Sequence, residues 1–300
     1  MFDVDSKQGQ ALRDFYTMLA VCHTVMVEKG DAPEEGAIMQ GEDDLLQYSA
    51  SSADELALVR GARDVGIVYH KRTAQIISIK LGGERYGAWA ERFEDYEALA
   101  EFPFDSARKR MSLLVRHVQT SRTYLMTKGA DQVMIPRVKL DLATQTKMEQ
   151  DLLKFAVQGL RTLVFTRKEL DDQELNEFMR KYTELKTSGD PYKDRKLLDL
   201  YDSLERGLDY LGSSAIEDKL QENVATTIEH IMNANVRVWV LTGDKQETAI
   251  DTAKACRLIQ EGVKPTILSS TSADDFKARL ERESQVQYPP EIQLTIVIDG

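Results

Sequence analysis

The sequence predicts an α/β protein of two domains. In residues 1–206, short runs of β-forming residues alternate with turns and helical segments, which is typical of an antiparallel sheet flanked by helices. In residues 207–300, strand-like and helix-like segments alternate, which is typical of a doubly wound parallel sheet. A length of 300 residues with 42% hydrophobic residues leaves room for a sizeable core.

The elements of the first domain follow from periodicity and capping signals. Ser52, followed three residues later by Glu55, forms a capping-box pattern at the start of a helix. Gly159 marks the end of a helix over residues 147–158. Helices are also expected at residues 9–27 and, with a break at 188–191, at 171–206. Strands are expected at residues 67–69, 75–81, 111–117, 123–126 and 160–166, with the helices on one side of their sheet.

The second domain has a different rhythm. The run at residues 236–241 is apolar nearly throughout, which predicts a strand buried on both faces of a parallel sheet. Further strands are expected at residues 265–268 and 294–298. The helices expected between and before them cover residues 221–233, 245–259 and 273–283.

Charge and composition exclude several classes of protein. Lys and Arg total 39 against 50 Asp and Glu, a net charge of −11, which argues against a general nucleic-acid binder. A locally basic pocket for a small anion stays compatible with this charge. Two cysteines, Cys22 and Cys256, are too few for a disulfide framework and favour a reducing, cytosolic setting. We find neither a secretory signal nor an apolar run of about 20 residues.

The turn after residues 236–241 is a candidate anion site. Thr242, Gly243 and Asp244 stand between a predicted strand and a helix, where free backbone amides and the helix dipole favour a phosphate. Asp244 and Glu247 also fit an ordinary capped turn, which is an equally good interpretation of the residues alone.

A second candidate site combines an aromatic ring with a basic run. Phe104 could stack on a purine base, and Arg108, Lys109 and Arg110 could balance phosphate charge. Taken alone, the segment fits better with an aromatic residue in the core followed by a solvated basic run.

Two single cations complete the set of candidates. Lys128 follows a predicted strand and could meet a phosphate, although a solvated lysine beside the turn at Gly129 is the simpler interpretation. Arg161 interrupts an apolar stretch and needs an anionic partner, either an acidic side chain or a ligand. Cys22 and His23 are adjacent and diverge, so we expect core residues rather than a nucleophile pair. The four histidines show no metal-ligand spacing.

In this order along the chain, the segments resemble the cytoplasmic nucleotide-binding domain and part of the phosphorylation domain of P-type ATPases. They are most similar to the type IV group, the phospholipid flippases, over residues 15–300. The segments that carry the resemblance are Cys22-His23-Thr24, Asp54-Glu55-x-Ala57-Leu58-Val59, Phe104-x-Ser106-Ala107-Arg108-Lys109-Arg110-Met111-Ser112, Lys128-Gly129-Ala130-Asp131, Gly159-Leu160-Arg161-Thr162-Leu163, Ala215-Ile216-Glu217-Asp218-Lys219-Leu220-Gln221 and Leu241-Thr242-Gly243-Asp244-Lys245-Gln246-Glu247-Thr248-Ala249.

The resemblance implies binding of ATP with Mg²⁺. It implies that Phe104 stacks on adenine, that Lys128 lies deep in the pocket and that Arg161 reaches the phosphates. It places Glu55, Ser106 and Met111 around the base, and Thr242, Gly243 and Asp244 at the γ-phosphate end in a second domain that is haloacid-dehalogenase-like.

The sequence also departs from the family pattern. Ala53 and Leu56 replace a common Pro and Gly, Asp105 replaces a small neutral residue, and Ala225 replaces a Pro. The phosphorylated aspartate of an Asp-Lys-Thr-Gly-Thr motif and the Gly-Asp-Gly motif are absent. We therefore expect a soluble cytoplasmic fragment of an integral membrane ATPase, which by itself does not autophosphorylate. Phospholipid and an accessory subunit would meet only the full-length protein.

Two alternatives stay open. The departures at Ala53, Leu56 and Asp105 fit a degenerate regulatory or scaffolding module that senses nucleotide or only supports a larger protein. A haloacid-dehalogenase-like phosphatase is suggested only by the turn at Thr242, and the chain lacks the Asp-x-Asp strand that such an enzyme needs.

Overall fold

The computed structural model describes residues 6–30, 42–82, 91–217, 220–242, 246–259, 263, 265–268, 273–284 and 295–298. The chain divides into two compact units, Met1–Ile216 and Glu217–Gly300. We expected the boundary at residue 206, but the first unit also includes the strand β10 (Leu208–Ile216). This strand pairs with another strand of the first unit.

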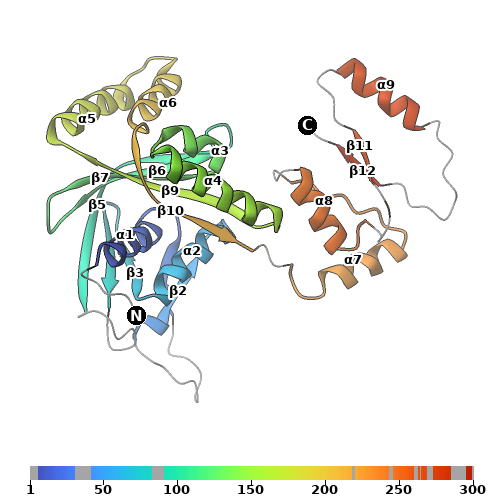
Figure 1. Ribbon diagram of the computed structural model, residues 1–300, viewed down its shortest axis with the longest axis horizontal. Coiled ribbons are helices and arrows are strands. Elements are labelled where there is room, and N and C mark those ends of the chain that lie inside the picture. Colours follow the sequence, from blue (N-terminus) through green and yellow to red (C-terminus); the bar gives the residue numbers. More distant parts are fainter. Residues whose placement is uncertain are drawn as a thin grey trace. The chain divides into compact units, whose positions relative to one another are not determined.

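In the described part of the chain, the first unit contains an eight-stranded sheet (Figure 1). Its neighbours are antiparallel except for the last pair in the order, which is parallel. In spatial order the strands are β3 (Ile67–Arg72), β4 (Ile76–Leu81), β5 (Arg92–Asp105), β6 (Arg110–His117), β7 (Thr123–Gly129), β9 (Arg161–Leu170), β10 and β8 (Val138–Lys139). Two further strands, β1 (Met26–Lys29) and β2 (Leu46–Ser49), form a separate antiparallel pair. A 3₁₀ turn, η1 (Glu42–Leu45), directly precedes β2.

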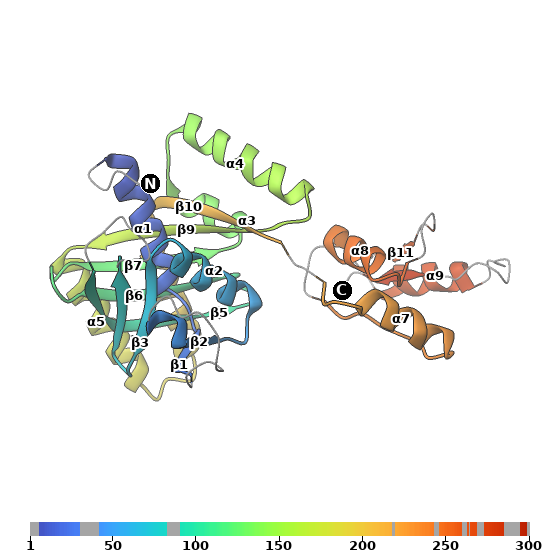
Figure 2. The ribbon, with the colours of Figure 1, turned by 90° about the horizontal axis from the view of Figure 1, so that it is seen from below.

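Helices cover both faces of this sheet, so the prediction of helices on one side was wrong (Figures 1 and 2). The physical reason is that the inner strands are apolar on both faces: in β6, Leu113 packs into one core cluster and Leu114 into the other. One cluster includes α1 (Lys7–Val21) and α2 (Ala53–Asp64). The other includes α3 (Asp131–Met134), α4 (Leu142–Val157), α5 (Asp172–Thr187) and α6 (Lys193–Leu204), with a 3₁₀ turn η2 (Ile135–Arg137) after α3.

The capping signals decide where several helices begin and end. The Ser52 hydroxyl accepts a hydrogen bond from the Glu55 amide at 3.4 Å, which confirms the predicted start of α2. α4 begins earlier than predicted, because the Asp141 carboxylate accepts from the Thr144 amide at 3.0 Å. Gly159 follows α4 with φ +75°, as expected for a helix end. The predicted break at residues 188–191 separates α5 from α6.

The longest strand of the sheet, β5, was not predicted. It has 14 residues, and many of them are charged, so its sequence does not show the simple alternation of a half-buried strand. Its carboxylates are satisfied by distant partners: Glu94 accepts from Arg13 at 2.6 Å and Asp95 accepts from Ser78 at 2.6 Å.

The described part of the second unit contains a parallel pair, β11 (Thr266–Leu268) and β12 (Ile296–Ile298), joined through α9 (Ala273–Ser284). It also contains α7 (Val224–Asn233) and α8 (Gln246–Ala255). The prediction of a buried strand at residues 236–241 was wrong: Trp239 is 79% exposed and Leu241 is 97% exposed. An apolar run becomes a buried strand only beside partner strands, and among the described residues β11 and β12 pair only with each other.

Candidate functional site

The predicted site residues of the first unit gather at one end of the sheet, which we call the site end. β5 ends at Asp105 and β7 ends at Gly129, while β6 begins at Arg110 and β9 begins at Arg161. Antiparallel pairing brings these termini together, because Asp105, Arg110 and Gly129 are successive partners across the three strands. The predicted residues at this end are Phe104, Ser106, Met111, Lys128 and Arg161.

Glu55 ties the first turn of α2 to the site end. One carboxylate oxygen, Oε1, accepts from Lys128 Nζ at 2.6 Å. The other, Oε2, accepts from the Thr24 amide at 3.0 Å and from the Thr24 hydroxyl at 2.5 Å. Burial alone would raise the pKa of Glu55, but Lys128 and the Thr24 donors have the larger, opposite effect. The pKa therefore lies below its ordinary value. At neutral pH the carboxylate is therefore charged.

Lys128 is a buried cation, so the interpretation of a solvated lysine was wrong. The residue is 7% exposed, and its Cα partner on β6 is Met111, which is 2% exposed. A buried ammonium needs a negative partner, and the Glu55 carboxylate supplies it. The two side chains are not fully enclosed, since Lys128 keeps 9% and Glu55 keeps 12% of its side-chain exposure.

Arg161 also pairs with α2. Its Nη1 lies 3.5 Å from Asp54 Oδ1, and its side chain is 33% exposed. The sequence left open whether an acidic side chain or a ligand balances this arginine; in the structure Asp54, the neighbour of Glu55, takes that place. A long, partly exposed ion pair of this kind contributes little to stability.

Phe104 lies near the end of β5, directly before the turn to β6. Phe104 is 65% exposed, so the alternative interpretation, an aromatic residue in the core, was wrong. Asp105 Oδ1 accepts from the amides of Ala107 at 2.8 Å and Arg108 at 3.1 Å, which fixes the turn. Asp105, a departure from the family pattern, therefore has a local structural role, and Ser106 lies exposed in the same turn.

The arginines of the basic run, Arg108 and Arg110, do not lie on the same face of the sheet as Lys128. Arg108 and Arg110 are buried, at 7% and 5% exposure, and both bind Glu205. Arg110 alternates with Met111 along β6, so it points to the opposite face of the sheet. For these two arginines the interpretation of a solvated run was wrong, while a role in balancing phosphate charge is not tested by the structure.

Sequence reasoning missed Thr24. As predicted, Cys22 and His23 are core residues: burial raises the pKa of Cys22 to about 11, and burial together with Lys128 lowers that of His23 to about 3. Neutral His23 accepts from the Val25 amide at 3.1 Å and donates to the Ala20 carbonyl at 2.9 Å, which fixes the corner that holds Thr24. Thr24 meets Glu55 across 31 positions, so no local signal could have revealed the contact.

In the second unit, Thr242 is exposed, and Gly243 and Asp244 lie outside the described residues. Because the two units are described separately, the structure does not relate Thr242 to the site end of the first unit. The roles of Thr242, Gly243 and Asp244 stay predictions.

Comparison with known proteins identifies the class. Residues 11–223 match the family model of the P-type ATPase cytoplasmic domain N. The chain therefore belongs to the P-type ATPase family. Its similarity to phospholipid-transporting ATPases further supports a place in the type IV group.

Three of these relatives show the extent of the match. The chain is 38% identical to phospholipid-transporting ATPase IK of Mus musculus over 87% of this chain and 18% of the relative. It is 36% identical to probable phospholipid-transporting ATPase 11 of Arabidopsis thaliana, over 89% and 21%. It is 38% identical to phospholipid-transporting ATPase IC of Homo sapiens, over 86% and 19%. The chain thus spans about a fifth of the length of these relatives.

None of the helices among the described residues is long and apolar enough to span a membrane.

Proposed function

We propose that the first unit binds ATP at the site end, as the nucleotide-binding domain of a phospholipid-transporting P-type ATPase, and that the second unit is part of the phosphorylation domain. The observation that carries the proposal is the buried Lys128–Glu55 pair at the first turn of α2. It lies at the sheet end that also carries the exposed Phe104 ring. An aromatic face, a cation and a hydrogen-bond acceptor are the groups that a purine nucleotide needs.

In this proposal each group has a distinct task. Phe104 stacks on the adenine ring, and Met111 offers apolar contact beside it. Glu55 accepts hydrogen bonds from the base, and the Ser106 hydroxyl bonds its polar edge. Lys128 donates to the nucleotide deep in the site, and Arg161 leaves Asp54 for the phosphates, since a triphosphate carries more charge than one carboxylate.

Mg²⁺ fits this site only as a partner of the phosphates. Among the described residues there is no group of three or more His, Cys, Asp or Glu side chains that could hold a metal ion. Mg²⁺ usually keeps several waters and binds through substrate phosphates, whose charge it neutralises. The residues of the first unit then need only to hold the base and orient the phosphate chain.

For the whole protein we propose hydrolysis of ATP through an aspartyl-phosphate, coupled to movement of a phospholipid across an integral membrane domain, with the present residues on the cytoplasmic side. Phosphoryl transfer of this kind depends on positioning and charge stabilisation, and the site end would supply the positioning. An accessory subunit would bind other parts of the full-length protein. Thr242, Gly243 and Asp244 would receive the γ-phosphate end.

Calorimetric titration of the 300-residue chain with ATP, with and without Mg²⁺, tests the proposal. We expect saturable binding of one nucleotide and no transfer of labelled phosphate to the protein. A folded chain that binds no ATP contradicts the proposal and favours the scaffolding module. Formation of an acid-stable, hydroxylamine-sensitive phosphoprotein would contradict the expectation that this chain does not autophosphorylate.

A further inference from the structure

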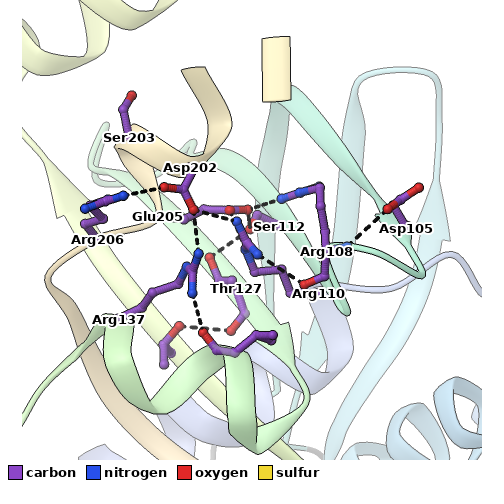
Figure 3. A network of polar contacts seen from close by, with 12 residues as sticks. Asp105, Arg108, Arg110, Ser112, Thr127, Arg137, Asp202, Ser203, Glu205 and Arg206 are labelled. Carbon is purple, nitrogen blue, oxygen red and sulfur yellow. Dashed lines mark hydrogen bonds and ion pairs between the residues drawn. The ribbon is translucent and has the colours of Figure 1, made fainter. Parts of the chain in front are cut away.

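A buried ionic network lies on the face of β6 and β7 opposite Lys128 (Figure 3). Its centre is Glu205, immediately after α6, whose side chain is 0% exposed. The guanidinium groups of Arg108 and Arg110 meet it with side-chain exposures of 8% and 6%. The proposed nucleotide contacts use none of these charges, so their role needs a separate explanation.

Both carboxylate oxygens of Glu205 are occupied by groups of β6 and the turn before it. Oε1 accepts from the Arg108 guanidinium and from the Ser112 hydroxyl, the latter at 2.6 Å. Oε2 accepts from Arg110 Nε at 2.6 Å. A single carboxylate thus holds the two arginines that flank Lys109, together with the third residue of β6.

Asp202 extends the network along α6. Its Oδ1 accepts from Arg110 at 2.9 Å and from Arg137 at 2.5 Å, and its Oδ2 accepts from Arg206 at 2.6 Å (Figure 3). Burial raises the pKa of Asp202, but the guanidinium groups of Arg206 and Arg137 outweigh it and lower the pKa to about 2. Arg110 is therefore fixed by two carboxylates at once.

The arginines brace the end of β5, which carries Phe104, and the turn that follows it. Arg108 Nη1 donates to the Pro103 carbonyl at 3.0 Å, directly before Phe104. Arg110 Nη1 donates to the Arg108 carbonyl at 3.1 Å, on the other side of the turn. The Arg108 guanidinium also lies 5.4 Å from the centre of the Tyr201 ring on α6. The backbone on both sides of Phe104 and Ser106 is thus bonded to groups that Glu205 holds.

The same network fixes the spacing between β6 and β7 beside Lys128. A Cβ atom added at Gly129 would lie 2.6 Å from Arg110 Cβ and 2.8 Å from the Lys109 carbonyl oxygen. The backbone next to Lys128 therefore packs directly on the arginine that Glu205 and Asp202 hold.

We propose that Glu205 is a positioning residue for the nucleotide: acting through Arg108 and Arg110 from the far face of the sheet, it fixes the end of β5 and the adjoining turn, which present Phe104 and Ser106 to the base. The inference deepens the proposed ATP site and rests on it. Glu205 itself touches no ligand; it sets the place of the groups that do.

The variant Arg108→Lys tests this brace with little change in charge. A lysine can still pair with Glu205, but one ammonium cannot reproduce the planar fork that bonds Glu205 and the Pro103 carbonyl from different nitrogens. We expect ATP affinity to fall about tenfold, as loss of one charge-assisted hydrogen bond would produce. The matched control is Arg180→Lys on α5, an arginine whose side chain is 68% exposed and pairs with Glu184 outside this network, and it should bind ATP like the wild type.

Adenosine separates positioning from direct phosphate contact. If the turn places the aromatic ring, Arg108→Lys weakens adenosine and ATP by the same factor. A loss confined to ATP overturns the proposal in favour of a phosphate contact. Unchanged affinity for both ligands in folded Arg108→Lys also overturns it.

Hydrogen exchange tests the bracing role without nucleotide, so it can be used even if Arg108→Lys does not fold or the wild type does not bind ATP. Glu205→Asp keeps the charge but shortens the side chain, so it cannot hold both arginines. Hydrogen exchange of the Ala107 and Lys109 amides, which bond to Asp105, should become at least about threefold faster, since weakened bracing opens the turn. The Glu174 amide in the α5 cap should stay unchanged. Equal exchange at Ala107 and Lys109 refutes the bracing role, whereas absence of ATP binding with faster exchange refutes only the nucleotide site.

Discussion

The two faces of β6 and β7 differ in how far their charged side chains are enclosed. On the α2 face, Glu55 and Lys128 form a pair with 12% and 9% side-chain exposure at the rim of the sheet. On the α6 face, Glu205 is fully enclosed and both of its oxygens bind fixed partners. The comparison shows that Arg108 and Arg110, the arginines nearest to Phe104 in the sequence, are held in a structural network, while the cation that we propose for ligand binding comes from the next strand. Variants at each face should therefore separate stability from binding.

The largest expected effect is on stability, from Glu205→Ala. Removing this carboxylate leaves two buried guanidinium groups without their central partner. We expect the free energy of unfolding to fall by about 3–5 kcal/mol, measured by urea denaturation. Glu55→Ala, on the more open face, should cost clearly less. Equal losses at the two positions would break the distinction between the faces.

The next effect is on binding, from Lys128→Met. The substitution keeps much of the side-chain volume and removes the ammonium, so ATP affinity should fall about 10- to 100-fold by calorimetry. Lys168→Met is the matched control, because Lys168 is another partly buried lysine, 2.5 Å from Glu174 and 18% exposed at its side chain. If both variants bind ATP like the wild type, Lys128 has no ligand role.

Phe104→Ala should lower nucleotide affinity by about 1–3 kcal/mol, the contribution of one base–aromatic stack. Because Phe104 is 65% exposed, the thermal midpoint should hardly move. Tyr192→Ala, at a ring that is 69% exposed and away from the site end, controls for general surface effects. A fall in thermal stability without a fall in affinity would instead assign Phe104 to the core.

A graded effect on stability is expected with pH on the α2 face. His23 is neutral in the folded chain, with a pKa lowered from 6.5 to about 3 by burial and by Lys128. Below pH 6.5 the unfolded chain binds a proton that the folded chain does not, so stability falls as the pH drops from 6.5 toward 3. The slope approaches at most about 1.4 kcal/mol per pH unit. In His23→Asn this slope should flatten in denaturation curves collected at several pH values; an unchanged slope would assign the loss to other groups.

Much of the fold was predictable because its signals are local. Ser52, Gly159 and the break at residues 188–191 each act within a few residues, and each lies where the sequence indicated. β5 was missed because its charged residues are neutralised far away along the chain, as Glu94 is by Arg13 across 81 positions. The prediction of a buried strand at residues 236–241 was wrong because an apolar pattern alone does not bury a strand. Burial also requires partner strands, which lie elsewhere in the chain.

The candidate site divides in the same way. Phe104, Lys128 and Arg161 could be singled out by residue type and position at strand ends. The contacts between residues could not be predicted, because Glu55 meets Lys128 across 73 positions and Glu205 meets Arg110 across 95. The basic run shows the consequence most clearly, since three adjacent cations gave no sign that two of them turn inward toward a carboxylate that follows a later helix.

The close approach at Gly129 limits how this protein can change. Even one added methyl group there would push against the neighbouring backbone and disturb both faces together, the lysine on one and the arginine cluster on the other. A saturation library at this position should therefore recover glycine almost alone, whether it is selected for folding or for ligand capture. If the proposed nucleotide site is correct, its preference should be easier to alter through exposed residues such as Ser106, whose side chain can vary without moving the strands.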